Sequence, residues 1–174
     1  MIQLDTSWLQ HVQKPARYTG GEYNSIVKNH STVDITMALG FPDVYEVAMS
    51  HLGIKILYGL VNRREDAVAE RVFAPWHDME EEMRKRNIPL FSLETRTPIK
   101  DFDVLAFTLQ YEMSFTNILN MLDLAGIPMY AKDRDMDFPL LVCGGPCAYN
   151  VEPIADFFDI VSLGESEEWG DEFI

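Results

Sequence analysis

Two cysteines are the side chains of this sequence whose type and spacing first suggest chemistry. Cys143 and Cys147 form a C-x-x-x-C pattern, which differs from the C-x-x-C pairs of zinc sites and redox motifs. A structural disulfide between them is not expected in a reducing compartment. We therefore assign no metal ligand and no catalytic residue to this chain.

A glycine-rich turn lies between the two cysteines. Gly144, Gly145 and Pro146 follow an apolar run, and paired glycines at the end of a strand allow the backbone to approach a ligand or a neighbouring chain closely. The simpler interpretation of two adjacent glycines is a tight turn. The context adds weight to the first interpretation, because a second short strand follows and ends at Gly164 and Glu165.

Several common chemistries are excluded by motifs that the sequence lacks. It contains no G-x-G-x-x-G after the first strand, no G-x-x-x-x-G-K-[ST] and no G-x-S-x-G, so it predicts no dinucleotide site, phosphate loop or nucleophile elbow. A receiver domain would need a carboxylate directly after the third strand and a lysine after the fifth. Gln110, Tyr111 and Gly164 occupy those places.

Strand-like and helix-like segments alternate along the chain and would position these loops. We expect strands at 33–41, 70–74, 104–109, 140–143 and 160–163, with helices at 45–62, 75–86 and 114–125 and a short helix capped by Asn150. Trp76, Met79 and Met83 would form the inner face of the second helix. Gly126 would cap the third helix, and 88–93 would be an edge strand or an extended link.

This alternation predicts an open, mainly parallel five-stranded, Rossmann-like α/β sheet with helices on both faces. Ligands of such sheets bind beyond the carboxyl ends of the strands, at the topological switch point. The loops of interest are therefore 41–51, 110–114, 144–150 and 164–168. Residues 1–32 lack periodicity, and we interpret them as an N-terminal arm that packs on another surface.

Composition sets further bounds. With 174 residues and 47% hydrophobic residues, the chain can form a normal core. No apolar run approaches the roughly 20 residues of a membrane span, and no signal peptide begins the chain, so we expect a cytoplasmic protein without membrane contact. The net charge of −14 argues against a nucleic-acid partner and favours solubility.

Four segments together resemble a known family. They are QKPARYTGGEYNS (13–25), LGFPDVYEVAMSHLGIKILYGL (39–60), AERVFAPWHDMEEEMR (69–84) and LLVCGGPCAYNVEPIADFFDIVSLGESEE (140–168). They are similar to the cobalamin-binding domain found ahead of many radical SAM catalytic domains. The sequence most resembles a bacterial subgroup with a cobalamin-binding-like N-terminal domain and no assigned reaction.

The resemblance implies a cobalamin-binding-like domain over residues 33–168, with 169–174 beginning the connection to a missing radical SAM catalytic domain. Cobalamin would bind in this domain, whereas the 4Fe-4S cluster and S-adenosylmethionine would bind only downstream. The chain alone would not be an enzyme, and its partner would be its own catalytic domain. The implied cofactor-binding residues are Pro42, Asp43, Val44, Tyr45, Met49, Ser50, His51, Gln110, Tyr111, Gly144, Gly145, Pro146, Gly164 and Glu165.

Two motifs of these families are incomplete. The cluster motif C-x-x-x-C-x-x-C has Asn150 in place of its third cysteine, so we expect no cluster on this chain. The cobalt-ligand motif D-x-H-x-x-G finds His51 and Gly53, but Met49 replaces its aspartate and Ile54 its last glycine. We therefore interpret His51 as a partly buried helix residue making one hydrogen bond, not as a cobalt ligand.

Three functions remain open. The chain could position a corrinoid or substrate against the downstream domain, with Val44, Tyr45 and Met49 covering the corrin face and Gly144 and Gly145 making backbone contacts. It could be a degenerate, corrinoid-free module that docks on the catalytic domain or binds a macromolecular substrate. A third reading is an independent sensor of a small ligand.

Overall fold

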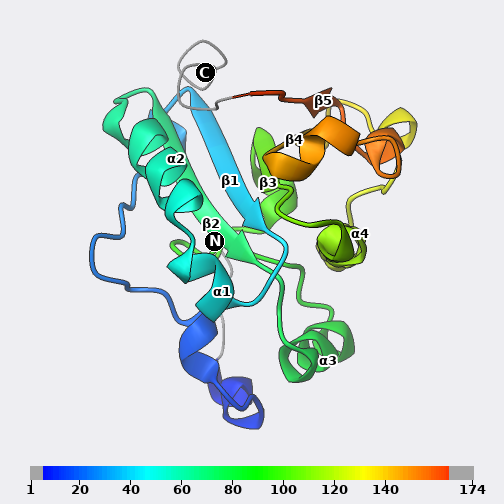
Figure 1. Cartoon of the computed structure of the whole chain (residues 1–174). Helices are drawn as coiled ribbons and strands as arrows, with labels where there is room; N and C mark the ends of the chain where they lie inside the picture. The colour runs from blue at the N-terminus through cyan, green and yellow to red at the C-terminus, as the bar shows by residue number, and fades with distance from the viewer. Residues whose placement is uncertain (1–5, 165–174) are drawn as a thin grey trace.

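The structure, a computed structural model, describes residues 6–164. At its centre lies one five-stranded sheet of β1 (Ile35–Phe41), β2 (Ala67–Phe73), β3 (Val104–Thr108), β4 (Leu140–Gly144) and β5 (Ile160–Val161) (Figure 1). The strand order is β2-β1-β3-β4-β5, and every pair of neighbours is parallel. This confirms the predicted open, parallel sheet.

The strands form because apolar side chains are available for both faces of the sheet. In β1, Met37 and Leu39 pack into one hydrophobic cluster while Ala38 packs into the other. Leu105 of β3 and Leu141 of β4 are fully buried in this second cluster. Burying such a side chain stabilises the fold by about 1.5–3 kcal/mol. Near-continuous apolar runs are typical of parallel strands covered on both sides.

Helices cover both faces, as predicted (Figure 1). On one face α1 (Tyr45–Ser50) and α2 (Leu52–Arg63) contribute Ala48, Ile54 and Tyr58 to the cluster around β1 and β2. On the other face α3 (His77–Arg86) and α4 (Phe115–Ala125) contribute Met79, Met83 and Ile118. Gly126 ends α4 in a left-handed conformation, which confirms its predicted capping role.

The predicted helix over 45–62 is wrong in one respect, because it is broken at His51. The backbone of His51 is extended, with φ −77° and ψ 124°, so α1 ends and α2 begins there. The imidazole compensates for the break by accepting a hydrogen bond from the Ile54 amide. An apolar stripe cannot reveal such a break, since Ile54, Tyr58 and Val61 remain buried on one face of α2.

Four smaller expectations are corrected. Trp76 does not join the inner face of α3, because it precedes the helix and is 44% exposed under Arg17. Asn150 caps no helix, since residues after β4 form two separate 3-10 helices. The second strand begins at Ala67, and β5 ends at Val161. Of the two alternatives for 88–93, the structure confirms the extended link, which has a single bridge from Phe91 to Pro98.

The remaining short helices are all of the 3-10 type: Thr6–His11, Pro15–Tyr18, His30–Thr32, Ile99–Asp101, Glu112–Ser114, Ala131–Asp133, Pro146–Asn150 and Ala155–Phe157. The arm packs as expected, with Trp8, Leu9 and Val12 buried in the cluster that also holds α3 and α4. The described part of the chain contains no helix with the length and apolar character that a membrane crossing needs.

The outer edge of β2 is closed by side chains and by the neighbouring link. The side-chain amide of Asn62 satisfies both backbone groups of Ala69 that face away from β1. It accepts from the Ala69 N–H at 3.2 Å and donates to the Ala69 carbonyl at 3.0 Å. Two residues at the end of the link hydrogen-bond to the backbone of Arg71. The Leu93 N–H donates to the Arg71 carbonyl, and the Glu94 carboxylate accepts from the Arg71 N–H. Capping these groups prevents another strand from pairing with this edge.

Candidate functional site

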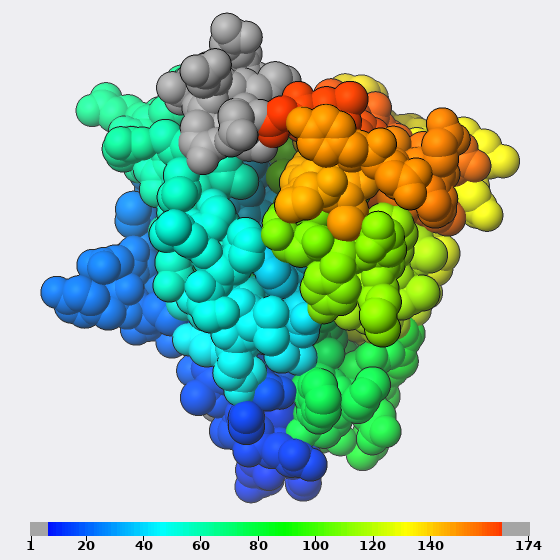
Figure 2. Space-filling view, in the orientation of Figure 1, coloured from blue at the N-terminus to red at the C-terminus, as the bar shows by residue number. Residues whose placement is uncertain are grey.

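The candidate site lies where the chain reverses its direction of travel across the sheet. From β1 the chain moves outward to β2, and it then crosses back to β3 and continues to β4 and β5. The carboxyl ends of β1 and β3 are therefore the topological switch point, where ligands of open parallel sheets bind. Figure 2 shows α1 and α2 (cyan) beside the segments that follow β3 (light green) and β4 (orange), on one face of the molecule.

A carboxylate and a phenol join the loops of β1 and β3. Asp43 accepts a hydrogen bond from the Tyr111 hydroxyl at 2.5 Å and another from the Val44 N–H at 2.7 Å. The hydrogen bond to Asp43, together with burial, raises the pKa of Tyr111. Behind this bridge the Asn117 amide of α4 donates to the carbonyl of Pro42. The switch point is thus braced before any ligand binds.

His51 makes a second bridge across the same crevice. Its Nδ1 accepts from the Ile54 N–H at 3.4 Å, and its Nε2 lies 3.1 Å from Oε1 of Gln110. Gln110 in turn donates to the Thr108 hydroxyl. These partners assign the Nε2–H tautomer, because Nδ1 must accept and Nε2 must donate. Both ring nitrogens are engaged, so His51 makes two hydrogen bonds instead of the single one expected.

The glycine turn after β4 is placed against β3. Gly145 has a φ of +109°, and a Cβ there would lie 3.0 Å from the carbonyl oxygen of Leu109. The turn is fixed by two hydrogen bonds with Leu109, which donates to Gly144 and accepts from the Cys147 N–H. Positive φ and close backbone approach both require glycine at position 145. The close approach that requires glycine at position 145 is therefore to the backbone of Leu109.

Tyr45 and Met49 do not join the other predicted residues at the switch point. Tyr45 packs edge-on against Phe73 at the end of β2 and donates to Glu22. Met49 packs into the cluster around β1 and β2, and its sulfur accepts from Arg71. Their positions on α1 turn both side chains toward β2, so in this conformation they do not form a wall above β3.

The remaining predicted residues lie at the rim. Val44 precedes α1 and is half-buried, while the exposed Ser50 donates to the Val47 carbonyl within α1. Pro146 opens the 3-10 helix after the glycine turn. Gly164 is exposed with a φ of +109°. Glu165 and the segment 169–174 lie outside the described residues.

The two cysteines differ in environment. Cys143 is a core residue of β4, as expected, and burial raises its pKa to about 12. Cys147 lies in the turn, and burial together with the neighbouring Glu112 raises its pKa. Within residues 6–164 no three histidine, cysteine or acidic side chains are grouped as metal ligands would be. The donor set does not fit a four-iron cluster, which needs cysteine thiolates as ligands.

The loops of the switch point carry no cationic side chain. Segments 42–51, 109–114 and 144–152 contain Asp43, Glu46, Glu112 and Glu152 but no lysine or arginine. Phosphates are usually held by lysine, arginine or a helix N-terminus with exposed N–H groups. The edge therefore suits a neutral or cationic group better than a free anion. Of the contacts expected for a corrin, Val44 lies at the rim, whereas Tyr45 and Met49 face β2 and the backbone of Gly145 already contacts Leu109.

A small cavity at the end of β2 is not the site. Its volume is about 30 Å³, room for one or two water molecules. Its lining residues come from the arm, the end of β2 and the 88–93 link: Arg17, Tyr18, Tyr45, Arg71, Val72, Phe73, Ala74, Pro75, Met79, Leu90, Phe91 and Leu93.

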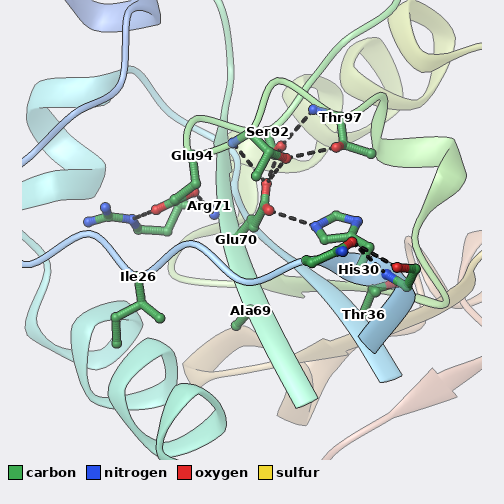
Figure 3. A network of polar contacts seen from close by, with 12 residues as sticks. Ile26, His30, Thr36, Ala69, Glu70, Arg71, Ser92, Glu94 and Thr97 are labelled. Carbon is green, nitrogen blue, oxygen red and sulfur yellow. Dashed lines mark hydrogen bonds and ion pairs between the residues drawn. The ribbon is translucent and has the colours of Figure 1, made fainter. Parts of the chain in front are cut away.

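Sequence reasoning missed a buried polar network beneath the arm (Figure 3). Glu70 of β2 is fully buried and accepts from the hydroxyls of Ser92 and Thr95 at 2.6 and 2.7 Å. Its other oxygen lies 2.7 Å from Nε2 of His30. Beside it, Arg71 and Glu94 form an ion pair of 2.6 Å. The available signal was an adjacent pair of charged residues inside an otherwise apolar strand.

Comparisons with known proteins identify the family of the chain. Residues 53–174 match the family described as the N-terminal domain of radical SAM proteins. An uncharacterized protein of Methanocaldococcus jannaschii is 28% identical over 134 residues, which cover 75% of this chain. The matched region is 24% of that relative, so the chain spans about a quarter of the length of the protein it resembles.

Proposed function

The chain belongs to the family of N-terminal domains of radical SAM proteins, and from this premise we propose that it is a cobalamin-binding-like module. It positions a corrinoid or a substrate against a downstream domain that carries the iron–sulfur cluster and S-adenosylmethionine. The observation that carries the proposal is the strand order β2-β1-β3-β4-β5 with a braced switch point between β1 and β3. That edge is where such a fold offers a ligand site.

Bound cobalamin would supply the reactivity of its cobalt, and this chain would supply shape and orientation. The Asp43–Tyr111 and His51–Gln110 bridges fix the positions of the loops beneath the ligand. Because the bridges already satisfy their own hydrogen bonds, they present a preformed surface that need not reorganise on binding. His51 acts within that surface as a helix cap, without ligating the metal.

Titration of the full-length protein with cobalamin tests the proposal. We expect saturable binding, and we expect His51→Ala to leave the visible spectrum of bound cobalamin unchanged, because both nitrogens of His51 serve the protein. Gly145→Leu should weaken binding by distorting the turn against Leu109. A spectral shift in His51→Ala would establish histidine ligation and contradict this account.

A second function is favoured by the same histidine. A module that kept the fold but lost the corrinoid would not need an imidazole free to bind cobalt, and both nitrogens of His51 are engaged. It would also not need Tyr45 and Met49 to cover a corrin face, and both side chains are directed toward β2. Such a module would dock on the catalytic domain or bind a macromolecular substrate. Absence of cobalamin binding by the full-length protein, with a normal cluster downstream, would select this alternative.

A further inference from the structure

The carboxyl edge of the sheet exposes large apolar side chains on three different loops. Met113 after β3 is 86% exposed, Tyr149 after β4 is 76% exposed, and Val47 of α1 is 43% exposed. Tyr111, which bridges to Asp43, is also exposed. We call these four residues the carboxyl-edge patch. Met and aromatic side chains gathered on one surface are typical of protein interfaces.

Contacts between the loops hold the residues next to the patch together. Tyr111 bonds to Asp43, which lies just before α1 and Val47. Glu112, next to Met113, interacts with the thiol of Cys147, two residues before Tyr149. The loops after β3 and β4 are further joined through the backbone of Leu109.

The rim of the patch is negatively charged. Glu112 and Glu152 are both exposed, and neither has an ion-pair partner within the described residues, whereas Glu46 is paired with Lys14 and Arg17. No lysine or arginine stands on the loops that form the patch. Desolvating this surface against another acidic surface would cost free energy, while a basic surface would complement it.

We infer that the carboxyl-edge patch is the contact face for a basic, apolar-centred surface of the catalytic domain in the same polypeptide. This inference rests on the proposed function and adds the chemistry of the contact, with Met113 and Tyr149 as its anchors. A second copy of this chain is disfavoured as the occupant, because each copy carries a net charge of −14. The same charge opposes nucleic acid and anionic membranes.

Photo-crosslinking in the full-length protein tests the contact. A photoreactive phenylalanine analogue replaces Met113 or Tyr149, and in a control it replaces Met136, which is 98% exposed near the amino end of β4. We expect crosslinks from positions 113 and 149 to lysine- or arginine-bearing peptides downstream, with at least tenfold higher yield than from 136. Crosslinks confined to a second copy, or yields equal to the control, would overturn the inference.

Charge reversal provides an independent readout. Glu112→Lys with Glu152→Lys should reduce the crosslink yield severalfold, and the matching Gln substitutions should reduce it less. Glu81→Lys, an exposed change on α3 away from the patch, should leave it unchanged. If Glu81→Lys reduces the yield as much as the double change does, only net charge matters and the assigned face is wrong. Cobalamin titration is separate, so docking can persist in a protein that binds no corrinoid.

Discussion

His51 shows how one side chain can look like a ligand and act as structure. Its Nδ1 caps α2, and its Nε2 donates to Gln110 in the loop after β3. The ring also packs beside Phe41. Metal ligation by a histidine needs one ring nitrogen with a free lone pair. In His51 the Nδ1 lone pair serves the Ile54 amide and Nε2 carries the proton, so ligation would cost the protein its helix cap.

We predict that His51→Ala destabilises the fold by about 1 kcal/mol, the usual cost of losing a side-chain N-cap. His51→Asn should recover much of this loss, because asparagine is a strong N-cap even though it does not reach Gln110. Urea unfolding of the two variants and the parent chain measures the difference. Equal stability of His51→Ala and the parent chain would show that the cap contributes nothing.

At the scale of the element, polar contacts hold the arm to the sheet in addition to its buried apolar side chains. His30 reaches Glu70 of β2 (Figure 3). Ser25 accepts from Arg71, and Lys28 donates to carbonyls at the end of α2. Lys14 and Arg17 hold the preceding part of the arm to Glu46 of α1. These contacts fix the arm along the edge strand, which also keeps α1 and the switch-point loops in place.

Removal of the buried carboxylate should weaken this attachment. Glu70→Ala leaves the hydroxyls of Ser92 and Thr95 and the ring of His30 without their acceptor. Unsatisfied buried donors cost about 1–3 kcal/mol each, so we expect a loss on the order of 3 kcal/mol in chemical denaturation. Glu65→Ala, on an exposed turn, is the matched control and should stay within about 0.5 kcal/mol. A small effect of Glu70→Ala would mean that the network relaxes.

The contact of the arm with α1 should depend on pH. Hydrogen bonding to Arg17 lowers the pKa of Glu46 from its ordinary value of 4.5 to about 2. Because the folded pKa is the lower one, the stabilisation is present above about pH 4.5 and is lost as the pH falls toward 2. The carboxylate of Glu46 is exposed to solvent, so the effect should be below about 1 kcal/mol.

Unfolding of the parent chain and Glu46→Gln at several pH values tests this linkage. The stability difference between them should shrink from pH 6 to pH 2 as the parent carboxylate becomes protonated. Glu81→Gln, an exposed change on α3, should show no such trend. A difference that grows on acidification would reverse the sign of the linkage.

At the scale of the whole molecule, the fold closes one side and leaves another for contact. The β2 edge is capped by Asn62 and the 88–93 link, while the carboxyl edge exposes Met113 and Tyr149. Exposed apolar area on a chain with net charge −14 is consistent with an assembly in which this domain meets a surface of opposite charge.

We predict that this chain alone assembles no [4Fe–4S] cluster. Cys143 is buried in β4 and the described residues provide no three-ligand group, whereas such clusters are held by cysteine thiolates. Anaerobic reconstitution followed by iron and sulfide analysis should find no stoichiometric cluster, with the full-length protein as the positive control. Stoichiometric iron and sulfide on the isolated chain would contradict this prediction.

The sequence by itself determined the parallel sheet and most of its elements, because the periodicity of apolar residues is a local property. The runs around Val104 and Leu141 predicted buried strands, and Gly126 predicted the end of α4. It also predicted which loops meet at one edge, since the carboxyl ends of parallel strands always share an edge. The buried position of Cys143 followed from the same pattern.

Only the tertiary structure decided what those loops do to one another. The bridge from His51 to Gln110 and the pairing of Asp43 with Tyr111 join residues 59 and 68 positions apart. The helix break at His51 depends on such contacts. No local pattern encodes such contacts, because they depend on strand order and on how each helix lies over the sheet. Likewise, only the structure shows that Glu70 is buried, because its partners Ser92, Thr95 and His30 come from the segment after α3 and from the arm.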